Sequence, residues 1–425
     1  MKLLAILPSI PVPANTGGTQ RTLNLVKSLD QAFDLTVLAP RLPSQDLASF
    51  EREIRGRVVT VPASARRSLV DEAMSAISGQ PFGYRKFASR KLRAALQALL
   101  SKEKFAAVHF DHIHTAQLLP IVRRRSPSAR VCIDQHNVEA MVLERLVPVS
   151  RRWMQPLLAV QARRVRHLEE KLMRESDLVT ACSSVDAGHL QAMGARTVRI
   201  IPNGVHIDFA AVPAPAPSEE RRSVVFVGSL DWWPNVEAAE RLVREIWPVV
   251  RARIRGARLV IVGRNPPRPL QAAACEDIVV TGTVPSVAPY LATAFATAIP
   301  LRAGSGTRLK VLEACAAHVP VVATRLAIEG LPFEHEREVL IAESPHEYAD
   351  ALARLEADGA LRDRLVRAAA KVAAGFDWRA VGDALVQQYA ELLGGRTDAP
   401  AQVVPIAPAL SAPFGRAGAL HEGRS

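Results

Sequence analysis

The sequence predicts an α/β protein built from two doubly wound parallel sheets that face each other across a cleft. Short apolar segments alternate with segments of helical spacing along residues 1–393. The alternation stops at residues 212–217 (Val-Pro-Ala-Pro-Ala-Pro), which have the composition of a stiff linker, and then restarts. Glycines follow predicted strands on both sides of this linker. Because open α/β sheets bind ligands at the carboxyl ends of their strands, we expect both sets of loops to line the cleft.

The first half begins with a predicted strand at residues 2–7 and a helix at residues 19–29, joined by a loop that ends in Gly17-Gly18. Further strands are expected at residues 34–39, 57–61, 106–110, 130–134, 178–182 and 199–201, and helices at 92–100 and 151–176.

The second half repeats the alternation of strands and helices. Its strands are expected at residues 223–227, 257–263, 278–282, 298–301, 320–323 and 339–342, and its helices at 234–250, from 345, from 360, and at 380–393. The 425-residue length suits two domains. We predict a domain over residues 1–210, a linker at 211–217, a second domain over 218–393 with a last helix able to pack back on the first, and a disordered tail at 394–425.

The most informative stretch lies between two of these strands, at residues 304–314 (Gly-Ser-Gly-Thr-Arg-Leu-Lys-Val-Leu-Glu-Ala). Glycines let the backbone approach a ligand, and the free N–H groups of the following helix make an anion site. Arg308 and Lys310 are expected in the first helical turn, where the helix dipole disfavours cations unless an anion binds. Glu313 borders the apolar stripe, and ribose hydroxyls would suit a carboxylate there. The predicted binding residues are Gly304, Ser305, Gly306, Thr307, Arg308, Lys310 and Glu313.

The formal net charge of +12 is unevenly placed. Residues 1–210 hold 30 Lys and Arg against 18 Asp and Glu, whereas residues 211–425 hold 24 of each. Nucleic acid is not expected as a partner, because no interleaved aromatic residues and no binding motif accompany the basic residues. A basic face toward an anionic membrane or acceptor and a merely solvated surface both remain open.

Four scattered cysteines with no metal-binding spacing favour a reduced, cytoplasmic protein. The first residues have the pattern of a strand instead of a signal peptide, and we find no apolar run of about 18 residues. We predict a cytoplasmic location, with peripheral contact at the inner face of the cell membrane as a second alternative.

Five short motifs, taken in order, resemble those of the retaining family 4 glycosyltransferases of GT-B fold: Gly17-Gly18, Pro202-Asn203-Gly204-Val205, Val227-Gly228, Ile261-Val262-Gly263 and Leu312-Glu313-Ala314. The resemblance covers nearly all of residues 1–393. It implies two Rossmann-like domains that move a sugar from a nucleotide-diphosphate sugar to a glycan or lipid-linked acceptor, with retention and without a metal or other cofactor. The donor would bind mainly to the second domain and the acceptor to the first. The segments at 228–235 and 304–310 look like a bacterial exopolysaccharide-type subgroup.

The resemblance assigns Glu313 to the second glutamate of the family's E-x7-E motif, which holds the ribose. The first glutamate would fall at Ser305, which is a departure from the motif. A second departure is that Ser229 and Asn235 stand where many members have an arginine and a lysine. We expect the two cations at the start of the helix to supply the missing positive charge.

In the first domain the resemblance assigns Gly17 and Gly18 to a flexible loop near the donor diphosphate, and His136 to a position beside the transferred sugar. With His136, we predict that Arg308 and Lys310 are catalytic, because charge builds on the departing diphosphate. Without a convincing nucleophilic carboxylate, the resemblance implies a same-face displacement. Weaker candidates for the acceptor side are Arg21, His109 and Asp111.

No metal site is predicted. His109, His112 and His114 alternate as residues of an extended strand would, without a complete ligand set, and the chain has no Asp-x-Asp pair. Three rival functions stay open: a nucleotide-sugar 2-epimerase of the same fold, a catalytically silent binding homologue, and a nicotinamide-dependent oxidoreductase, which lacks the third glycine of its fingerprint here.

Overall fold

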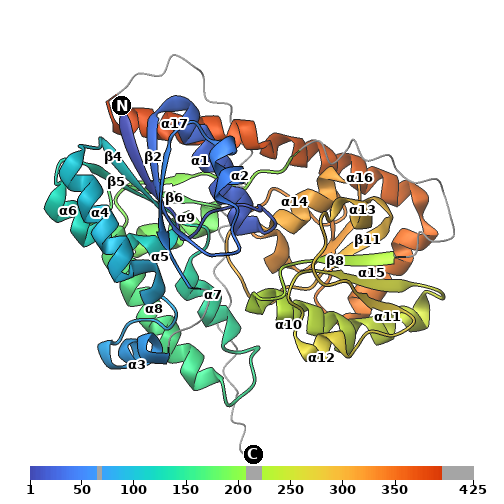
Figure 1. Ribbon diagram of the computed structural model, residues 1–425. Coiled ribbons are helices and arrows are strands. Elements are labelled where there is room, and N and C mark those ends of the chain that lie inside the picture. Colours follow the sequence, from blue (N-terminus) through green and yellow to red (C-terminus); the bar gives the residue numbers. More distant parts are fainter. Residues whose placement is uncertain (65–68, 207–222, 395–425) are drawn as a thin grey trace, which may run out of the picture.

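Two parallel sheets form the frame of the molecule (Figure 1). The computed structural model describes residues 1–64, 69–206 and 223–394. The first sheet has the strand order β3-β2-β1-β4-β5-β6-β7, and the second has the order β10-β9-β8-β11-β12-β13. In each sheet the order reverses beside the first strand, so the loops after β1, β4, β8 and β11 open at the binding edges. This arrangement confirms the predicted fold class.

The first half contains β1 to β7 and helices on both faces of the sheet (Figure 1). Its elements are β1 Lys2–Ile6, α1 Gly17–Ala32, β2 Asp34–Arg41, α2 Leu47–Glu53, β3 Arg57–Pro62, α3 Leu69–Ser78, η1 Arg85–Ala88, α4 Arg90–Lys102, β4 Ala107–Asp111, α5 His112–Ala116, α6 Leu119–Arg125, β5 Arg130–Asp134, α7 Glu139–Leu146, α8 Gln155–Glu175, β6 Leu178–Ala181, α9 Ser184–Ala192 and β7 Val198–Ile200.

The second half follows the undescribed residues 207–222, which include the expected linker. Its elements are β8 Ser223–Val227, α10 Trp233–Arg241, a π-helical turn Leu242–Ile246, α11 Trp247–Arg253, β9 Arg258–Val262, α12 Arg268–Gln271, β10 Ile278–Val280, α13 Ala288–Ala292, β11 Ala294–Ile299, α14 Leu309–Ala316, β12 Val321–Ala323, η4 Arg325–Ile328, β13 Leu340–Ile341, α15 Pro345–Ala357, α16 Gly359–Ala373, η5 Ala374–Phe376 and α17 Trp378–Leu392. Except for Gly394, the expected tail also lies outside the described residues.

Alternating side chains of β1 enter two different cores, as expected for a strand covered on both faces. Leu3 and Ala5, with Leu7 just after the strand, belong to a core that continues into the second half, whereas Leu4 and Ile6 join the core beneath α4 to α9. Apolar side chains of the first sheet therefore share one core with side chains of the second half.

The last helix, α17, crosses from the second half to the first and packs on α1 (Figure 1). Tyr389 is 1 % exposed, and its ring lies 6.3 Å from that of Phe33, measured between ring centres. The end of the chain's second half therefore contributes to the core of the first.

One expectation about local structure is wrong. The histidines at 109, 112 and 114 do not lie on one extended strand, because β4 ends at Asp111 and α5 begins at His112. His112 has a φ of 71°, and its ring stacks on that of His114 with 4.1 Å between ring centres. The three histidines are three and then two residues apart, so their spacing did not have the period of two that a strand requires.

None of the helices in the described parts of the chain has both the length and the apolar character needed to cross a membrane.

Candidate functional site

The loop at residues 304–307 reaches from the second half to the first. Ser305 Oγ accepts a hydrogen bond from the N–H of Val138 at 2.6 Å and donates one to Asp186 Oδ1 at 2.9 Å. Thr307 Oγ1 donates to the carbonyl of Cys182 at 2.6 Å. The side chain at the position of the missing glutamate therefore joins the two halves.

Gly306 has a reason to be glycine. Its φ is 78°, and a Cβ there would lie 2.4 Å from the carbonyl oxygen of His136. A side chain would clash with the backbone at this point of contact between the two halves. Gly304, with a φ of 131°, also has a backbone conformation that favours glycine.

Arg308 is the N-cap residue of α14 and lies just outside the first turn where it was expected. Its side chain is buried, and Nη1 donates to the carbonyl of Gly306. Nε and Nη2 have no hydrogen-bond partner among the described residues, and Nη2 lies 4.0 Å from Glu329 Oε2. Burial lowers the pKa of Arg308, and Asp186 opposes that shift. An incompletely hydrogen-bonded buried guanidinium is well suited to an anion.

Lys310 is the second cation at this helix end. Its Nζ donates to Asn235 Oδ1 at 2.5 Å and lies 4.5 Å from the centre of the Phe226 ring. Burial, together with the charge of Arg308, lowers the pKa of Lys310 to about 7. A Cβ on Gly228 would lie 3.1 Å from Lys310 Nζ, so the ammonium group lies at the end of β8, where an anion would stabilise the protonated amine.

Arg264 is a cation at this edge that the sequence analysis missed. Its Nε donates to Ser229 Oγ at 2.9 Å, and Nη2 lies 3.0 Å from Asp231 Oδ2. Ser229 and Asn235, which stand where many relatives have cations, are thus each bonded to a cation from elsewhere, Arg264 and Lys310. Arg264 directly follows the motif ending at Gly263, which was a usable signal.

Glu313 faces the first half. Its side chain is buried, and Oε1 accepts a hydrogen bond from Gln20 Nε2 of α1 at 3.4 Å. Burial raises the pKa of Glu313, opposed by Gln20 and Lys310. Gly17, at the start of α1, lies against α14, because a Cβ there would be 3.1 Å from Leu309 Cδ1. The start and the middle of α14 therefore lie against the start of α1 in the first half.

His136 lies on the opposite wall, at the end of β5. Its Nε2 is 2.8 Å from Asp111 Oδ1 and 3.3 Å from Asp134 Oδ2. Burial alone would lower the pKa of His136, but the two carboxylates outweigh burial and raise the pKa to about 9. A Cβ on Gly18 would lie 3.6 Å from His136 Nδ1, so this nitrogen is turned toward the glycine loop. The carboxylates of Asp111 and Asp134 therefore keep the ring in its protonated, imidazolium form.

Arg21 is in the same cluster but is fully engaged. Its Nε donates to Asp134 Oδ2 at 2.8 Å, Nη2 lies 2.5 Å from Asp134 Oδ1, and Nη1 donates to the carbonyl of Ile201 at 2.9 Å. Thr22 Oγ1 donates to Asp111 Oδ2 at 2.7 Å. The structure thus brings Arg21, Asp111 and His136 together in one cluster, in which Arg21 makes its hydrogen bonds to the protein itself.

One group of described residues has the atoms to hold a cation. Ligand atoms of Asp111, Asp134 and His136 all lie within 4.8 Å of one another. Arg21 already bonds to both oxygens of Asp134, however, and His136 is protonated at neutral pH. The negative charge that a metal would need is therefore balanced by two organic cations.

His109 makes its hydrogen bond outside this cluster. Its Nδ1 is 2.6 Å from the hydroxyl oxygen of Tyr389 on α17, and its side chain is buried. Burial lowers the pKa of His109. The structure gives this histidine a hydrogen bond to the last described helix, while the charges of Asp134, Asp111, His136 and Arg21 also act on its pKa.

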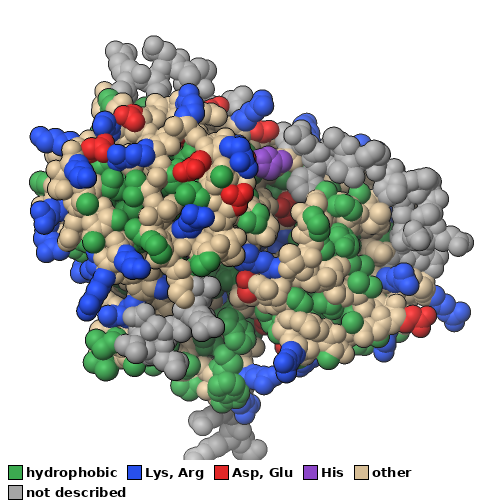
Figure 2. All heavy atoms as spheres, viewed as in Figure 1, with side chains coloured by type: hydrophobic (Ala, Val, Ile, Leu, Met, Phe, Trp, Pro, Cys, Tyr) green, Lys and Arg blue, Asp and Glu red, His purple; other side chains and the backbone are tan. Residues whose placement is uncertain are grey.

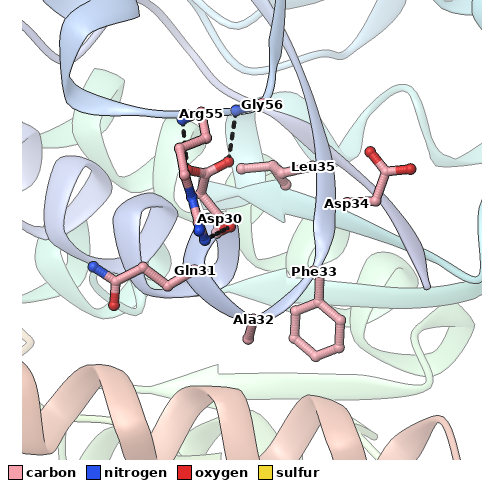
Figure 3. A pocket seen from close by; sticks show the side chains of 8 residues that line it. All are labelled: Asp30, Gln31, Ala32, Phe33, Asp34, Leu35, Arg55 and Gly56. Atoms are coloured by element: carbon pink, nitrogen blue, oxygen red, sulfur yellow. Dashed lines mark hydrogen bonds and ion pairs between the residues drawn. The ribbon is translucent and has the colours of Figure 1, made fainter.

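A separate hollow of about 360 Å³ lies at the amino-terminal end of β2 in the first sheet (Figure 3). It is lined by residues around the end of α1 and the start of β2, and Asp30 there bonds to the backbone N–H groups of Arg55 and Gly56 at 2.7 and 2.8 Å. These bonds satisfy the carboxylate within the protein. The hollow is remote from the carboxyl ends of the strands, so we do not assign the site to it.

Solved structures share this architecture. Sucrose-phosphate synthase from Thermosynechococcus elongatus is 18 % identical, with a TM-score of 0.70, and the match covers 93 % of this chain and 100 % of that one. HepE of Anabaena in complex with UDP-glucose is 13 % identical, with a TM-score of 0.65 and coverage of 92 % and 100 %. A glycosyltransferase from Rickettsia africae is 12 % identical, with a TM-score of 0.61 and coverage of 92 % and 97 %. At these identities the likeness shows a common fold.

Comparison with curated protein sequences gave no significant match. Two family profiles do match, one in each half of the chain. Residues 16–204 match the glycosyl transferase 4-like domain, and residues 221–358 match the glycosyl transferases group 1 profile. The two profiles follow one another along the chain, together cover well over half of it, and each contains one wall of the cleft, so the chain belongs to the group 1 glycosyl transferases.

Proposed function

We propose that the protein transfers a sugar from a nucleoside-diphosphate sugar to a glycan or lipid-linked acceptor, with retention at the anomeric carbon. The observation that carries this proposal is the excess of buried positive charge at the start of α14. Arg308 has two nitrogens without a hydrogen-bond partner among the described residues, and Lys310 has a pKa lowered to about 7. A bound diphosphate would accept hydrogen bonds from the unpaired Arg308 nitrogens and would stabilise the protonated form of Lys310.

The proposed donor would bind to the second half in one orientation. The diphosphate would bind beside Gly228, where Lys310, Arg264 and the first N–H groups of α14 lie at one edge of the sheet. Glu313 would accept hydrogen bonds from the ribose hydroxyls. Support for this donor class comes from similar folds: HepE of Anabaena was solved with UDP-glucose, and an Escherichia coli protein was solved with UDP-2-fluoro glucose.

The first half would supply the groups around the transferred sugar. His136 is a cation with Nδ1 turned toward Gly18, and it would donate a hydrogen bond to the sugar. As the donor bond breaks, negative charge grows on the diphosphate, and the cations of the second half would stabilise it without a metal ion. The departing phosphate oxygen would then accept the proton of the acceptor hydroxyl on the same face.

The biological setting is proposed from resemblance. The segments at 228–235 and 304–310 look like those of bacterial exopolysaccharide-type transferases. We therefore propose a role in exopolysaccharide or cell-surface polysaccharide synthesis.

The test is a thermal-shift panel of UDP, GDP and ADP sugars, followed by product analysis. A donor at about 100 times its dissociation constant adds about 2.7 kcal/mol to the free energy of unfolding, which raises the melting temperature measurably. We expect one nucleotide class to stabilise the protein and to release nucleoside diphosphate when acceptor extract is added. Formation of a 2-epimer from donor alone would instead identify an epimerase, and no shift with any donor would contradict the proposal.

A further inference from the structure

An exposed apolar surface lies at one end of the first half. Nine large apolar side chains are exposed in the described parts of the chain, and six of them belong to α3, α8 or the segments next to these helices. Ile77 is 81 % exposed and Trp153 is 73 % exposed. We call this surface the α3–α8 tip; it consists of Met74, Ile77, Phe82, Trp153, Leu157 and Val160.

The two segments of the tip are joined by contacts. The N–H of Phe82, just after α3, donates to Gln161 Oε1 of α8 at 3.0 Å. The guanidinium of Arg164 lies 5.8 Å from the centre of the Phe82 ring. Figure 2 shows hydrophobic side chains gathered at the lower end of this half, where Figure 1 places α3 and the start of α8.

The charge on the α8 side of the tip is positive, whereas α3 also contains Asp71 and Glu72. Between Glu144 and Glu169 the sequence contains six arginines and no carboxylate. Arg151 and Arg152 are exposed beside Trp153, and neither forms an ion pair with a described residue, whereas Arg166 pairs with Glu144 at 2.6 Å. Exposed apolar side chains flanked by unpaired arginines complement an anionic surface that has an apolar interior.

We propose that the α3–α8 tip docks on an anionic lipid bilayer. Trp153 would lie at the level of the headgroups, where tryptophan is favoured, and Ile77 and Leu157 would enter the upper acyl region. Arg151 and Arg152 would extend along the surface to lipid phosphates. This inference concerns where the protein works and does not depend on the donor chemistry proposed above.

The experiment is co-sedimentation of the full chain with vesicles of phosphatidylcholine alone or with about 30 % phosphatidylglycerol. The wild type should sediment with the anionic vesicles and remain in solution with the neutral ones. Arg151→Glu/Arg152→Glu and Trp153→Ser/Leu157→Ser should each lower the partition coefficient by about tenfold or more, because both charge and apolar contact are needed.

Matched variants separate this surface from general charge. Arg124→Glu/Arg125→Glu makes the same charge change at another exposed arginine pair, at the end of α6, and Val279→Ser removes an exposed apolar side chain of the second half. Both should sediment like the wild type. Equal loss in the two arginine pairs, or no sedimentation of the wild type, would overturn the proposal.

A second measurement does not depend on the folding of the double variants. Brominated lipids should quench the part of the tryptophan fluorescence that Trp153→Phe removes. Lack of that quenching would count against insertion. If the tip instead forms a dimer, light scattering should show a concentration-dependent dimer that Trp153→Ser/Leu157→Ser abolishes, and membrane docking would be rejected. Donor-induced thermal shifts should be unchanged in all the tip variants.

Discussion

Lys310 shows how burial can prepare a residue for an anionic ligand. Its ammonium group has one hydrogen bond, to Asn235, and a neighbouring cation in Arg308. Both burial and Arg308 favour the neutral amine, so the pKa falls to about 7. A diphosphate would reverse this balance, because the charge-assisted hydrogen bond is available only to the protonated amine.

We predict that Lys310→Ala weakens binding of the best donor by about 10- to 100-fold, the usual worth of one charge-assisted hydrogen bond. Affinity in the wild type should also fall as pH rises above about 7, because the free protein then loses the Lys310 proton. Isothermal titration calorimetry between about pH 6 and pH 8 would measure both effects. Lys371→Ala, at an exposed lysine of α16, is the control and should bind like the wild type. A pH-independent affinity in the wild type would contradict the proposed contact.

The pKa of His136 is raised instead of lowered, and the prediction for this residue concerns the stability of the fold. Burial disfavours its charged form, but Asp111 and Asp134 raise its pKa to about 9, above the value of about 6.5 expected in the unfolded chain. A raised pKa contributes stability that is fully present below about pH 6.5 and is lost as pH rises through about 9. We therefore expect the wild type to lose roughly 1 to 3 kcal/mol relative to His136→Gln between these limits.

Urea unfolding of both proteins across that pH range would measure the difference. Parallel stability profiles for the wild type and His136→Gln would show that the imidazolium is not stabilised by the two carboxylates.

At the scale of elements, the contact between α1 and α17 determines how the end of the chain meets the first half. Gly382 of α17 is close to Ser28 of α1: a Cβ on the glycine would lie 2.0 Å from Ser28 Oγ and 2.8 Å from Ser28 Cβ. The helices can approach only because residue 382 lacks a side chain.

We predict that Gly382→Ala lowers the free energy of unfolding by roughly 1 to 3 kcal/mol, although alanine is the better helix former. Ser28→Gly should recover part of this loss in the double variant, which a double-mutant cycle would show. Gly188→Ala in α9 is the control, since a Cβ there would meet nothing within 4 Å. It should be neutral or stabilising by up to about 1 kcal/mol. Additive effects at residues 28 and 382 would contradict the contact.

At the scale of the whole molecule, an ion pair between described residues joins the two halves. Arg145 of α7 bonds to both carboxylate oxygens of Glu329, at 2.6 and 2.8 Å, and to the carbonyl of Gly304 at 2.7 Å. Both side chains of the pair are 18 % exposed, so this geometry is worth more than a surface pair.

We expect Arg145→Met to lower the free energy of unfolding by roughly 1 to 3 kcal/mol and to increase the radius of gyration as the halves separate. Chemical unfolding and small-angle X-ray scattering would measure the two effects. Arg166→Met removes a similar two-oxygen pair with Glu144, but within the first half and exposed to solvent. This control should cost at most about 1 kcal/mol and leave the radius unchanged. Equal effects of the two variants would show that the Arg145 pair does not hold the halves together.

Local patterns predicted the fold well because its strands are short, apolar and regularly spaced. The strands at residues 130–134 and 223–227 were predicted with the bounds they have in the structure. The predicted helix at residues 234–250 is interrupted by a π-helical turn. The helices of ten residues or fewer that were not predicted are α2, α3, α5, α6, α7, α9, α12 and α13. Their few residues give too little periodicity to separate helix from loop.

The candidate site was less predictable, because its residues meet only after the halves pack. Sequence indicated that Lys310 and Glu313 lie on a helix near glycines, and this follows from local spacing. It could not show that Ser305 bonds to Val138 across the cleft or that Arg264 bonds to Ser229, since these contacts join residues far apart in the chain.

The sequence by itself determined the family, the two sheets and the loops that carry the candidate residues, because apolar periodicity and glycine spacing are local properties. Only the tertiary structure decided what the charges face. Asp111 and Asp134 make His136 an imidazolium, and burial together with Arg308 lowers the pKa of Lys310, because electrostatic energies depend on distance and burial instead of sequence order.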